Sequence, residues 1–217
     1  MTNKQNKISQ FNRSGNVHYR VEQRDNGETG LMLQVDFDRA PEPDHSFVAD
    51  FVEVSKTEAD VLIVFGKIDL PSGKKLRNKV ELYFSFTPFV HQLWRSSRRL
   101  HAALANSMEQ RGDVAKDSSG ISSETEKVMT LVTNNVLIVQ ASGQCLLDFF
   151  LISAKDLWVK TRKGDPLNVE GLVRVFINEH LLLEFMNRCD EIAQGLVKDL
   201  DITFSEDDDE VMESIAL

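Results

Sequence analysis

Long apolar runs, paired cysteines and clustered histidines are all missing from this 217-residue chain. The longest apolar stretch, residues 145–152, is interrupted by Asp148 and is far shorter than the ~20 residues that a helix needs to cross a bilayer. The first 16 residues are polar and lack the apolar segment of a secretory signal. These absences predict a cytoplasmic protein without a membrane partner.

Only two cysteines occur, Cys145 and Cys189, and they are far apart and form no CxxC motif. Each lies in an apolar pattern, which is typical of a buried free thiol. Two free thiols suit a reducing cytosol, because disulfides form and persist in oxidising compartments.

The five histidines show none of the spacings that hold a metal ion. His91 and His101 are ten residues apart on one predicted helix, and no two histidines form an HxH, HxxxH or HExxH pattern. The chain has no GxSxG motif, and GKIDLPSGKK has the wrong spacing for a phosphate-binding loop. We therefore predict a protein that is not an enzyme and has no catalytic residues, no cofactor and no metal site. An enzyme of an unrecognised type is the alternative.

Negative charge is concentrated at the C-terminus. The formal net charge is −9, and the last 19 residues contain eight Asp and Glu but no Lys or Arg. The rest of the chain is therefore close to neutral and binds a phosphate backbone poorly, because such binding needs clustered Lys and Arg. We predict that residues 201–217 form a flexible acidic tail. The tail either keeps the protein soluble or docks on a basic partner through its apolar end, EVMESIAL.

One basic cluster departs from this balance. Basic side chains beside an aromatic ring can contact nucleic acid. A solvated helix face, paired with acidic groups or with the acidic tail, is the alternative that we favour, so nucleic acid is not an expected partner. The cluster consists of Trp94, Arg95, Arg98 and Arg99 on a predicted helix, with Lys74, Lys75 and Arg77 before it in the sequence.

Alternating apolar residues predict the strands of the first half. Val17–Glu22 and Leu31–Phe37 flank the turn-rich stretch RDNGETG and predict a β-hairpin. After a proline-containing linker, Phe47–Val54 and Asp60–Ile68 predict two strands joined by the short loop SKTEA. These four segments indicate sheets that are mainly antiparallel.

A strand that leads directly into a helix follows. Lys79–Phe86 alternates in polarity, and apolar residues then recur at helical spacing as far as about Glu109. Thr87 is predicted as the helix N-cap, because its hydroxyl can accept from a free first-turn N–H. Pro88 is predicted as the first helical residue, where it has no N–H to leave unpaired.

The second half shows the same sequence of patterns. Asn134 and Asn135 form a turn pair between two short strands, and the later helix, capped by Asn178, extends to about Leu200. The predicted strands are Lys127–Thr133, Val136–Ala141, Cys145–Ile152 with Trp158–Thr161 as an extension, and Leu172–Ile177.

Both halves thus contain strand, strand, strand and helix in that order. We predict an α+β fold of antiparallel sheets with helices packed on one face, built as two tandem β-β-β-α units. Its parts are a disordered N-terminus (1–16), a first unit (17–112), a Ser/Gly-rich linker (113–126), a second unit (127–200) and the acidic tail (201–217). The predicted alignment places Ala49–Val54 on Asn134–Val139, Val61–Phe65 on Leu146–Phe150, Leu82, Phe84 and Phe86 on Val173, Val175 and Ile177, and Leu93, Trp94, Leu100 and Leu104 on Phe185, Met186, Ile192 and Leu196.

Two resemblances to known families follow from these stretches. Residues 47–104, with the strand pair FVADFVEVSKTEADVLIVFG and a strand that ends in Thr-Pro, resemble a small uncharacterised bacterial family of strand–strand–strand–helix domains. The same layout, with LMLQVDFDRAPEP, is similar to SecB-type export chaperones. That resemblance implies an acidic, cytosolic, oligomeric, non-enzymatic protein that binds protein clients. This chain departs from those chaperones because it is longer, repeats its unit and has the linker 113–126.

We therefore predict a protein-binding module, a chaperone or adaptor, that holds extended apolar client segments by backbone pairing at sheet edges. Self-association into a homo-oligomer is expected for the same reason, and a structural subunit that assembles through those edges is the alternative function. Core packing is the alternative use of most of the phenylalanines. The residues predicted to contact a client are Phe47, Phe51, Phe65, Phe84, Trp94, Arg95, Arg98, Arg99, Phe149 and Phe150.

Overall fold

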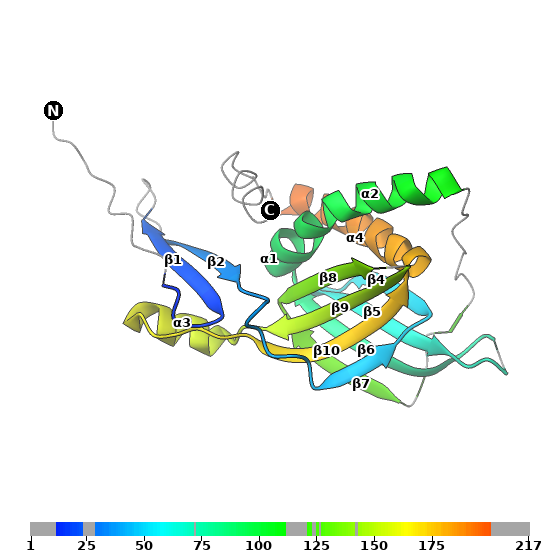
Figure 1. Cartoon of the computed structure of the whole chain (residues 1–217), viewed down its shortest axis with the longest axis horizontal. Helices are drawn as coiled ribbons and strands as arrows, with labels where there is room; N and C mark the ends of the chain where they lie inside the picture. Colours follow the sequence, from blue (N-terminus) through cyan, green and yellow to red (C-terminus); the bar gives the residue numbers. More distant parts are fainter. Residues whose placement is uncertain are drawn as a thin grey trace.

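The computed structural model describes residues 12–23, 29–71, 73–111, 121–122, 125, 127–141 and 143–200. Residues 1–11, most of the predicted linker and the acidic tail lie outside this part of the chain. The described residues form an α+β fold, as predicted, with one two-stranded sheet and two four-stranded sheets (Figure 1).

Each half of the chain contributes four strands to the two larger sheets. An N-terminal hairpin, β1 (Val17–Gln23) and β2 (Thr29–Val35), precedes both halves. The first half contains β3 (His45–Val48), β4 (Phe51–Lys56), β5 (Asp60–Ile68), β6 (Leu76–Ser85), α1 (Phe86–Pro88), η1 (Phe89–Trp94) and α2 (Arg95–Arg111). The second half contains β7 (Val128–Thr133), β8 (Asn135–Ala141), β9 (Gln144–Leu151), α3 (Ala154–Lys163), β10 (Glu170–Asn178) and α4 (Glu179–Asp199).

Both four-stranded sheets contain strands from both halves. One sheet has the order β4-β5-β6-β7, and the other has the order β8-β9-β10-β3. Neighbours from the same half are antiparallel, whereas β7 pairs with β6 and β3 pairs with β10 in parallel. The two halves therefore exchange β3 and β7, so neither half contains a complete sheet of its own.

Two crossings carry the chain from one sheet to the other. Between β3 and β4, the carboxylate of Asp50 accepts a hydrogen bond from the N–H of Ile68 at 2.6 Å. Between β7 and β8, the side-chain oxygen of Asn134 accepts from the N–H of Ile152 at 2.8 Å. At each crossing, a side-chain oxygen thus accepts a hydrogen bond from the backbone at the end of a neighbouring strand. Such bonds are expected where the chain turns a corner between two packed sheets.

A constant shift in residue number relates the first strands of the two sheets. Val52 pairs with Phe65, and 84 residues further on Val136 pairs with Phe149. Every recorded pair of β4 with β5 has its counterpart at the same shift. The predicted alignment of these strands used a shift of 85 and is wrong by one position. Apolar residues occupy both faces of β5 and β9, so periodicity alone does not fix the register. A common origin of the two halves stays a prediction.

The last strands and the helices follow slightly different shifts. Leu82 of β6 and Val175 of β10 occupy equivalent positions, a shift of 93 residues, so the predicted alignment of these strands, with a shift of 91, is wrong by two positions. Leu93 and Phe185, both fully buried, are related by a shift of 92, as in the predicted alignment. The first half therefore has one additional residue in its helix. The wide π-helical turn η1, which bonds each residue to the fifth along the chain, accommodates it.

Both sheets turn one face toward a common apolar core, and helices α1, η1, α2 and α4 lie along one side of it (Figure 1). Helices α1, η1 and α2 follow one another without a break over residues 86–111. Helix α4 begins where predicted, because the side-chain oxygen of Asn178 accepts from the N–H of Leu181 at 2.9 Å. Each of these helices thus starts directly at the end of the last strand of its half, β6 or β10.

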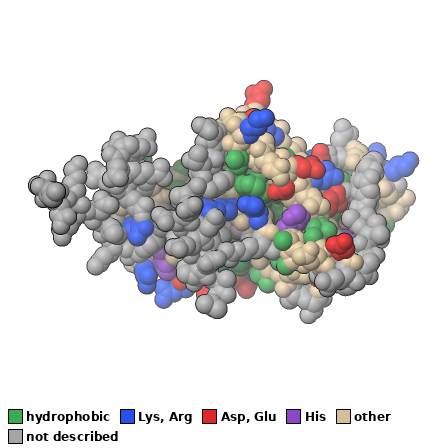
Figure 2. All heavy atoms as spheres, turned by 90° about the horizontal axis from the view of Figure 1, so that it is seen from above, with side chains coloured by type: hydrophobic (Ala, Val, Ile, Leu, Met, Phe, Trp, Pro, Cys, Tyr) green, Lys and Arg blue, Asp and Glu red, His purple; other side chains and the backbone are tan. Residues whose placement is uncertain are grey.

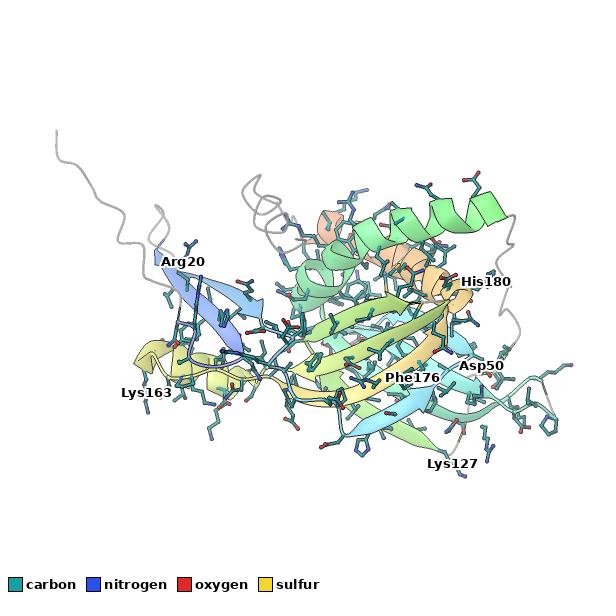
Figure 3. All side chains as sticks on the ribbon, in the orientation of Figure 1. Arg20, Asp50, Lys127, Lys163, Phe176 and His180 are labelled. Carbon is teal, nitrogen blue, oxygen red and sulfur yellow. The ribbon has the colours of Figure 1, made fainter. Side chains whose placement is uncertain are left out.

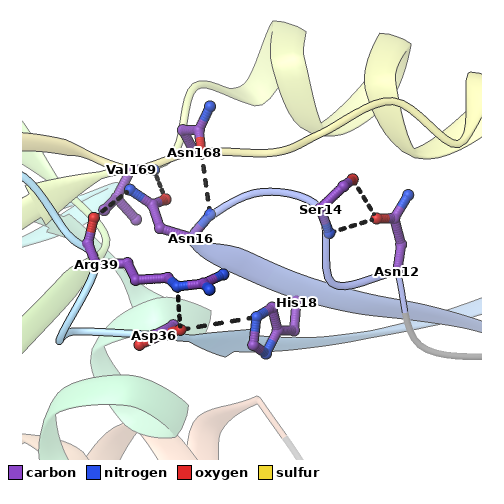
Figure 4. Close-up of polar contacts among 8 residues, drawn as sticks. All are labelled: Asn12, Ser14, Asn16, His18, Asp36, Arg39, Asn168 and Val169. Atoms are coloured by element: carbon purple, nitrogen blue, oxygen red, sulfur yellow. Dashed lines mark hydrogen bonds and ion pairs between the residues drawn. The ribbon is translucent and has the colours of Figure 1, made fainter.

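The predicted N-terminal hairpin packs with α3 against the outer side of one sheet. The N–H of Asn16 donates to Oδ1 of Asn168 at 3.1 Å, and the N–H of Val169 donates to Oδ1 of Asn16 at 2.8 Å (Figure 4). On the hairpin, His18 and Arg39 approach the carboxylate of Asp36 at 3.9 and 3.7 Å (Figure 4). These contacts attach the hairpin to the loop between α3 and β10.

Two predicted element boundaries are wrong in the first half. The single strand predicted over Phe47–Val54 is divided, because the chain leaves one sheet at Ala49 and enters the other at Phe51. The helix begins at Phe86, so Thr87 lies inside its first turn and is not the N-cap. Pro88 is the third helical residue and not, as predicted, the first, and it fits there because first-turn N–H groups have no helical partner.

One predicted strand extension, Trp158–Thr161, is wrong because these residues belong to α3. The side chain of Ser153 caps the helix by accepting from the N–H of Asp156, and Gly164 ends it with a positive φ of 73°. These short-range signals favour a helix although the composition of the segment is typical of a strand.

Candidate protein-binding surface

Three of the predicted client-contacting residues form the centre of the core. Phe65, Phe84 and Phe149 are fully buried. The ring of Phe149 lies 5.9 Å from that of Phe65 and 6.4 Å from that of Phe84, between centroids. These rings join the two sheets and contact one another rather than the surface.

Three further phenylalanines are covered by neighbouring segments. Phe51 and Phe150 lie at the outer sides of the two sheets, where Phe37 packs on Phe150 at a centroid distance of 5.5 Å and Ile121 packs on the Phe51 cluster. Phe47 is half-buried against the main core. The described chain thus covers the rings that the sequence proposes for a client.

The basic cluster around Trp94 connects two helices. The indole N–H of Trp94 donates to the carboxylate of Asp190 on α4 at 2.7 Å, and the exposed Arg98 lies 5.3 Å from the centre of its ring. Arg95 is half-buried, whereas the side chain of Arg99 is not among those described. On the face seen from the helix side, Lys and Arg side chains lie among Asp and Glu (Figure 2). Trp94 therefore holds α4 against η1.

An apolar row crosses the outer face of the sheet that contains β10. Val48, Phe176, Leu146 and Val139 are consecutive cross-strand neighbours on β3, β10, β9 and β8. Val48 is 58% exposed and Val139 is 43% exposed, whereas Phe176 and Leu146 are half-buried. Figure 3 shows Phe176 on the near side of this sheet. Side chains directly opposite one another contact, so the four form one continuous apolar strip.

The other sheet carries the equivalent row. Val132, Tyr83, Leu62 and Ser55 are cross-strand neighbours on β7, β6, β5 and β4, at the positions that the constant shifts assign to the first row. Val132 is 59% exposed, nearly the same fraction as Val48. Two rows at equivalent positions therefore lie on opposite outer faces of the molecule, the first apolar throughout and the second ending in the polar Ser55 on β4.

Each row ends on an edge strand that is open on one side within the described sheets. β3 pairs only with β10, and β7 pairs only with β6, among the strands that the structure describes. Exposed side chains follow both edges, His45, Ser46 and Val48 on β3 and Val128, Thr130 and Val132 on β7. An uncovered edge next to exposed apolar side chains is a typical template for pairing with another strand.

A charged pair lies beside the row on the β10 sheet. Arg174 donates from Nε and Nη2 to the two carboxylate oxygens of Asp148 at 2.7 and 2.8 Å. The carboxylate of Asp148 is nearly buried, and Glu42 approaches the guanidinium at 3.9 Å. The hydrogen bond to Asp148, with the charges of both carboxylates, raises the pKa of Arg174 above its ordinary value, so the guanidinium stays charged.

Sequence reasoning did not find these rows. Alternation in polarity identifies one apolar face of each strand, and that face is expected to lie in the core. A usable signal is present in β7, whose residues VMTLV are apolar on both faces although the strand is short. At a sheet edge this pattern indicates one buried and one exposed apolar face.

The described nucleophilic side chains include two buried thiols. Within the described residues, no group of three or more His, Cys, Asp or Glu is arranged to hold a metal ion. Burial, with a smaller contribution from Glu179, raises the pKa of Cys145 to about 11, and burial also raises the pKa of Cys189. Both thiols therefore stay protonated at neutral pH and are poor nucleophiles. None of the described helices has the length and apolar character needed to cross a membrane.

Comparisons with models of protein families, with curated proteins and with solved structures find no match for this chain.

Proposed function

We propose that this chain is a non-enzymatic protein-binding module, a chaperone or adaptor, that holds extended apolar segments of client proteins. The observation that supports it is the pair of equivalent outer rows, each ending in a largely exposed valine on an open strand edge. Soluble proteins rarely leave matching apolar strips exposed on two faces without a binding role. The residues that we propose to contact a client are therefore those of the two rows, in place of the buried phenylalanines.

The proposed mode of binding is strand addition. A client segment pairs its backbone with β3 or β7, and its alternate side chains lie on the neighbouring apolar row. Backbone hydrogen bonds are independent of sequence, whereas the row selects apolar side chains on one face of the client. The binding would therefore favour segments with alternating apolar residues and tolerate many sequences.

Substitutions at the two edges test this mode. The probe is a fluorescently labelled ten-residue peptide of alternating Val and Thr, and the measurement is its anisotropy during titration. Val48→Lys and Val132→Lys place a charge where the client side chains would lie, and each is expected to abolish one site. The double variant should bind at least about tenfold more weakly, a difference of about 1.4 kcal/mol.

Leu70→Lys is the matched control, because Leu70 is 84% exposed in the loop after β5, away from both edges. It should bind the peptide as the unsubstituted chain does. Equal affinity in the unsubstituted chain and in all four variants would remove the rows from the proposal. The single variants at Val48 and Val132 should also be weaker at suppressing aggregation of a chemically denatured protein at stoichiometric amounts. The double variant should be the weakest, and Leu70→Lys should be unchanged.

The exposed edges also favour a second function, that of a structural subunit. In that case a second copy of the chain occupies β3 or β7, and the protein assembles through its sheet edges. Light scattering separates the two functions. A molar mass that is a multiple of 24.6 kDa and falls to one chain in the Val48→Lys or Val132→Lys protein, without peptide binding, favours assembly.

A further inference from the structure

Helix α3 presents a face that is cationic and aromatic. Lys155, Trp158, Val159, Arg162 and Lys163 are all exposed, and Trp158 is 63% exposed. The guanidinium of Arg162 lies 3.4 Å from the centre of the Trp158 ring, a cation–π contact between two exposed side chains. A large ring held at the surface by a cation is an unusual arrangement for a short helix that has only a solvent-facing role.

The charges on this face are not balanced by the rest of the described chain. The carboxylate of Asp156 pairs with Lys160 at 2.9 Å, on the other side of the helix. No described carboxylate forms an ion pair with Lys155, Arg162 or Lys163. Figure 3 shows Lys163 at the far end of α3, pointing away from the body. The face is therefore complementary to a segment with several negative charges.

Helix α3 also has no counterpart in the first half. There, the loop 69–75 joins β5 to β6, whereas α3 lies within the longer connection 152–169 between β9 and β10. Helix α3 is not needed to complete either large sheet, since the first half connects the equivalent strands β5 and β6 without a helix. Its outward face is therefore available for a role of its own.

The acidic tail has the composition that fits this face. Residues 201–217 contain seven Asp and Glu, no Lys or Arg, and the apolar residues of the terminal EVMESIAL. The carboxylates match the cations of α3, and the apolar residues match Trp158 and Val159. The tail thus combines both kinds of contact that the face offers.

The end of α4 lies close enough for the tail to reach α3. Asp199 pairs with Lys56 at 2.8 Å, and Lys56 lies 5.7 Å from the ring centre of Phe86 at the start of α1. Asn134, at the crossing beside the end of β6, bonds to Ile152, two residues before α3. Figure 1 shows the end of α4, α1 and the start of α3 toward the same end of the body. An extended chain spans about 3.3 Å per residue, so the tail can cover several tens of ångströms.

We propose that residues 201–217 dock on the outward face of α3 in the same chain, with the carboxylates on Lys155, Arg162 and Lys163 and the apolar end on Trp158 and Val159. This contact is independent of the proposed client binding at the sheet edges. The face of α3 is then a site for acidic segments that also contain apolar residues, and the tail is the segment of this chain that occupies it.

Acrylamide quenching of Trp158 fluorescence tests the contact. Trp94→Phe leaves Trp158 as the only tryptophan, and the quenching constant is compared between the full chain and a chain that ends at Leu200. Removal of the tail is expected to raise the quenching constant about twofold, and 0.5 M NaCl should raise it in the full chain but not in the shortened one. Equal constants in the two chains would overturn the proposal.

Charge reversal identifies the side chains involved. Lys155→Glu with Lys163→Glu should raise quenching in the full chain as much as removal of the tail, and should have no further effect in the shortened chain. Lys127→Glu is the control, because Lys127 is exposed and lies at the opposite end of the molecule (Figure 3). An equal effect of Lys127→Glu would mean that only net charge matters and would also overturn the proposal.

Zero-length carbodiimide crosslinking provides a second measurement on the unsubstituted chain. Crosslinks from Lys155 and Lys163 to the tail carboxylates should exceed those from Lys127 and should not depend on protein concentration. Crosslinks that appear only at high concentration would assign the site to the tail of a second copy instead. Uniform crosslinking from all three lysines would refute a specific site.

Discussion

Asn134 is expected to be among the most sensitive polar positions in the protein. Its side chain makes two hydrogen bonds to the backbone of Ile152: Nδ2 donates to the carbonyl at 2.8 Å, and Oδ1 accepts from the N–H at 2.8 Å. Ile152 is 1% exposed, so water has poor access to these backbone groups. Asn134→Ala therefore removes both bonds and leaves a buried donor and a buried acceptor without their partners.

The magnitude follows from the unpaired backbone groups. A buried donor or acceptor that loses its partner costs about 1–3 kcal/mol, and relaxation of the crossing recovers part of this. We expect Asn134→Ala to lower the free energy of unfolding by about 2–4 kcal/mol, a large share of the roughly 5–15 kcal/mol typical of a folded protein. Asn134→Asp keeps the acceptor but turns a carboxylate oxygen toward the Ile152 carbonyl, so it should be at least as destabilising.

The crossing between β3 and β4, at Asp50, provides a comparison for the effect of Asn134→Ala. Asp50 accepts from the N–H of Ile68 at 2.6 Å and pairs with Lys67 at 2.7 Å on the partly exposed surface. Asp50→Ala should cost about 2–3 kcal/mol, since a bond to a charged acceptor contributes about 1.5–3 kcal/mol. Asp50→Asn retains the acceptor and loses only the surface ion pair, which contributes about 0–1 kcal/mol.

Urea unfolding followed by circular dichroism measures these differences. Gln140→Ala is the control, because the exposed Gln140 makes a single surface hydrogen bond to Glu179. Gln140→Ala should be the most stable of these variants and Asp50→Asn the next. Asp50→Ala and Asn134→Ala should be the least stable. If Asn134→Ala were as stable as Gln140→Ala, the crossings would not hold the sheets as described.

Two further predictions concern titratable groups. The hydrogen bond and charge of Lys56 lower the pKa of Asp199 below its ordinary value of 3.8, so their contribution to stability is present above that value and is lost as the pH falls through the lowered folded pKa. Lys56→Met should therefore be less stable than the unsubstituted chain at pH 7, and the difference in thermal melts should shrink as the pH falls below 3.8, whereas a difference that does not change with pH would contradict this cause. The pKa of Cys145, raised from 9.0 to about 11, reduces the thiolate at pH 8 about a hundredfold, so iodoacetamide should alkylate it at least that much more slowly in the folded chain than in urea. Comparable rates in the two states would show that the thiol is not buried.

The sequence predicts the antiparallel hairpins well, because each needs only short-range information. Residues 57–59, within the predicted loop SKTEA, join β4 to β5, and the N-cap at Asn178 begins α4, as expected from turn and capping residues. The α+β class follows from the same local patterns. These features depend on residues within a few positions of one another, which is the range over which periodicity and capping act.

The exchange of β3 and β7 could not be predicted in the same way. It depends on whether a strand continues in its own sheet or crosses at Ala49–Asp50, and an alternating pattern such as FVADFVEV is compatible with both. The exposed rows were missed for a related reason. Whether Val48 faces the core or the surface depends on its parallel partner Phe176, which lies in the other half of the chain.

The two outer faces share their apolar rows but differ in the position next to them, and this difference bears on the proposed function. The position of the ion pair between Asp148 and Arg174 corresponds, at the same shifts, to Val64 and Glu81 on the other face. Glu81 is instead paired with Lys79 at 2.8 Å, within its own strand. A client segment placed along either edge would meet similar apolar side chains but different flanking charges. Under the proposed function, the two edges therefore hold the same kind of apolar segment and discriminate between clients by the charged residues beside it.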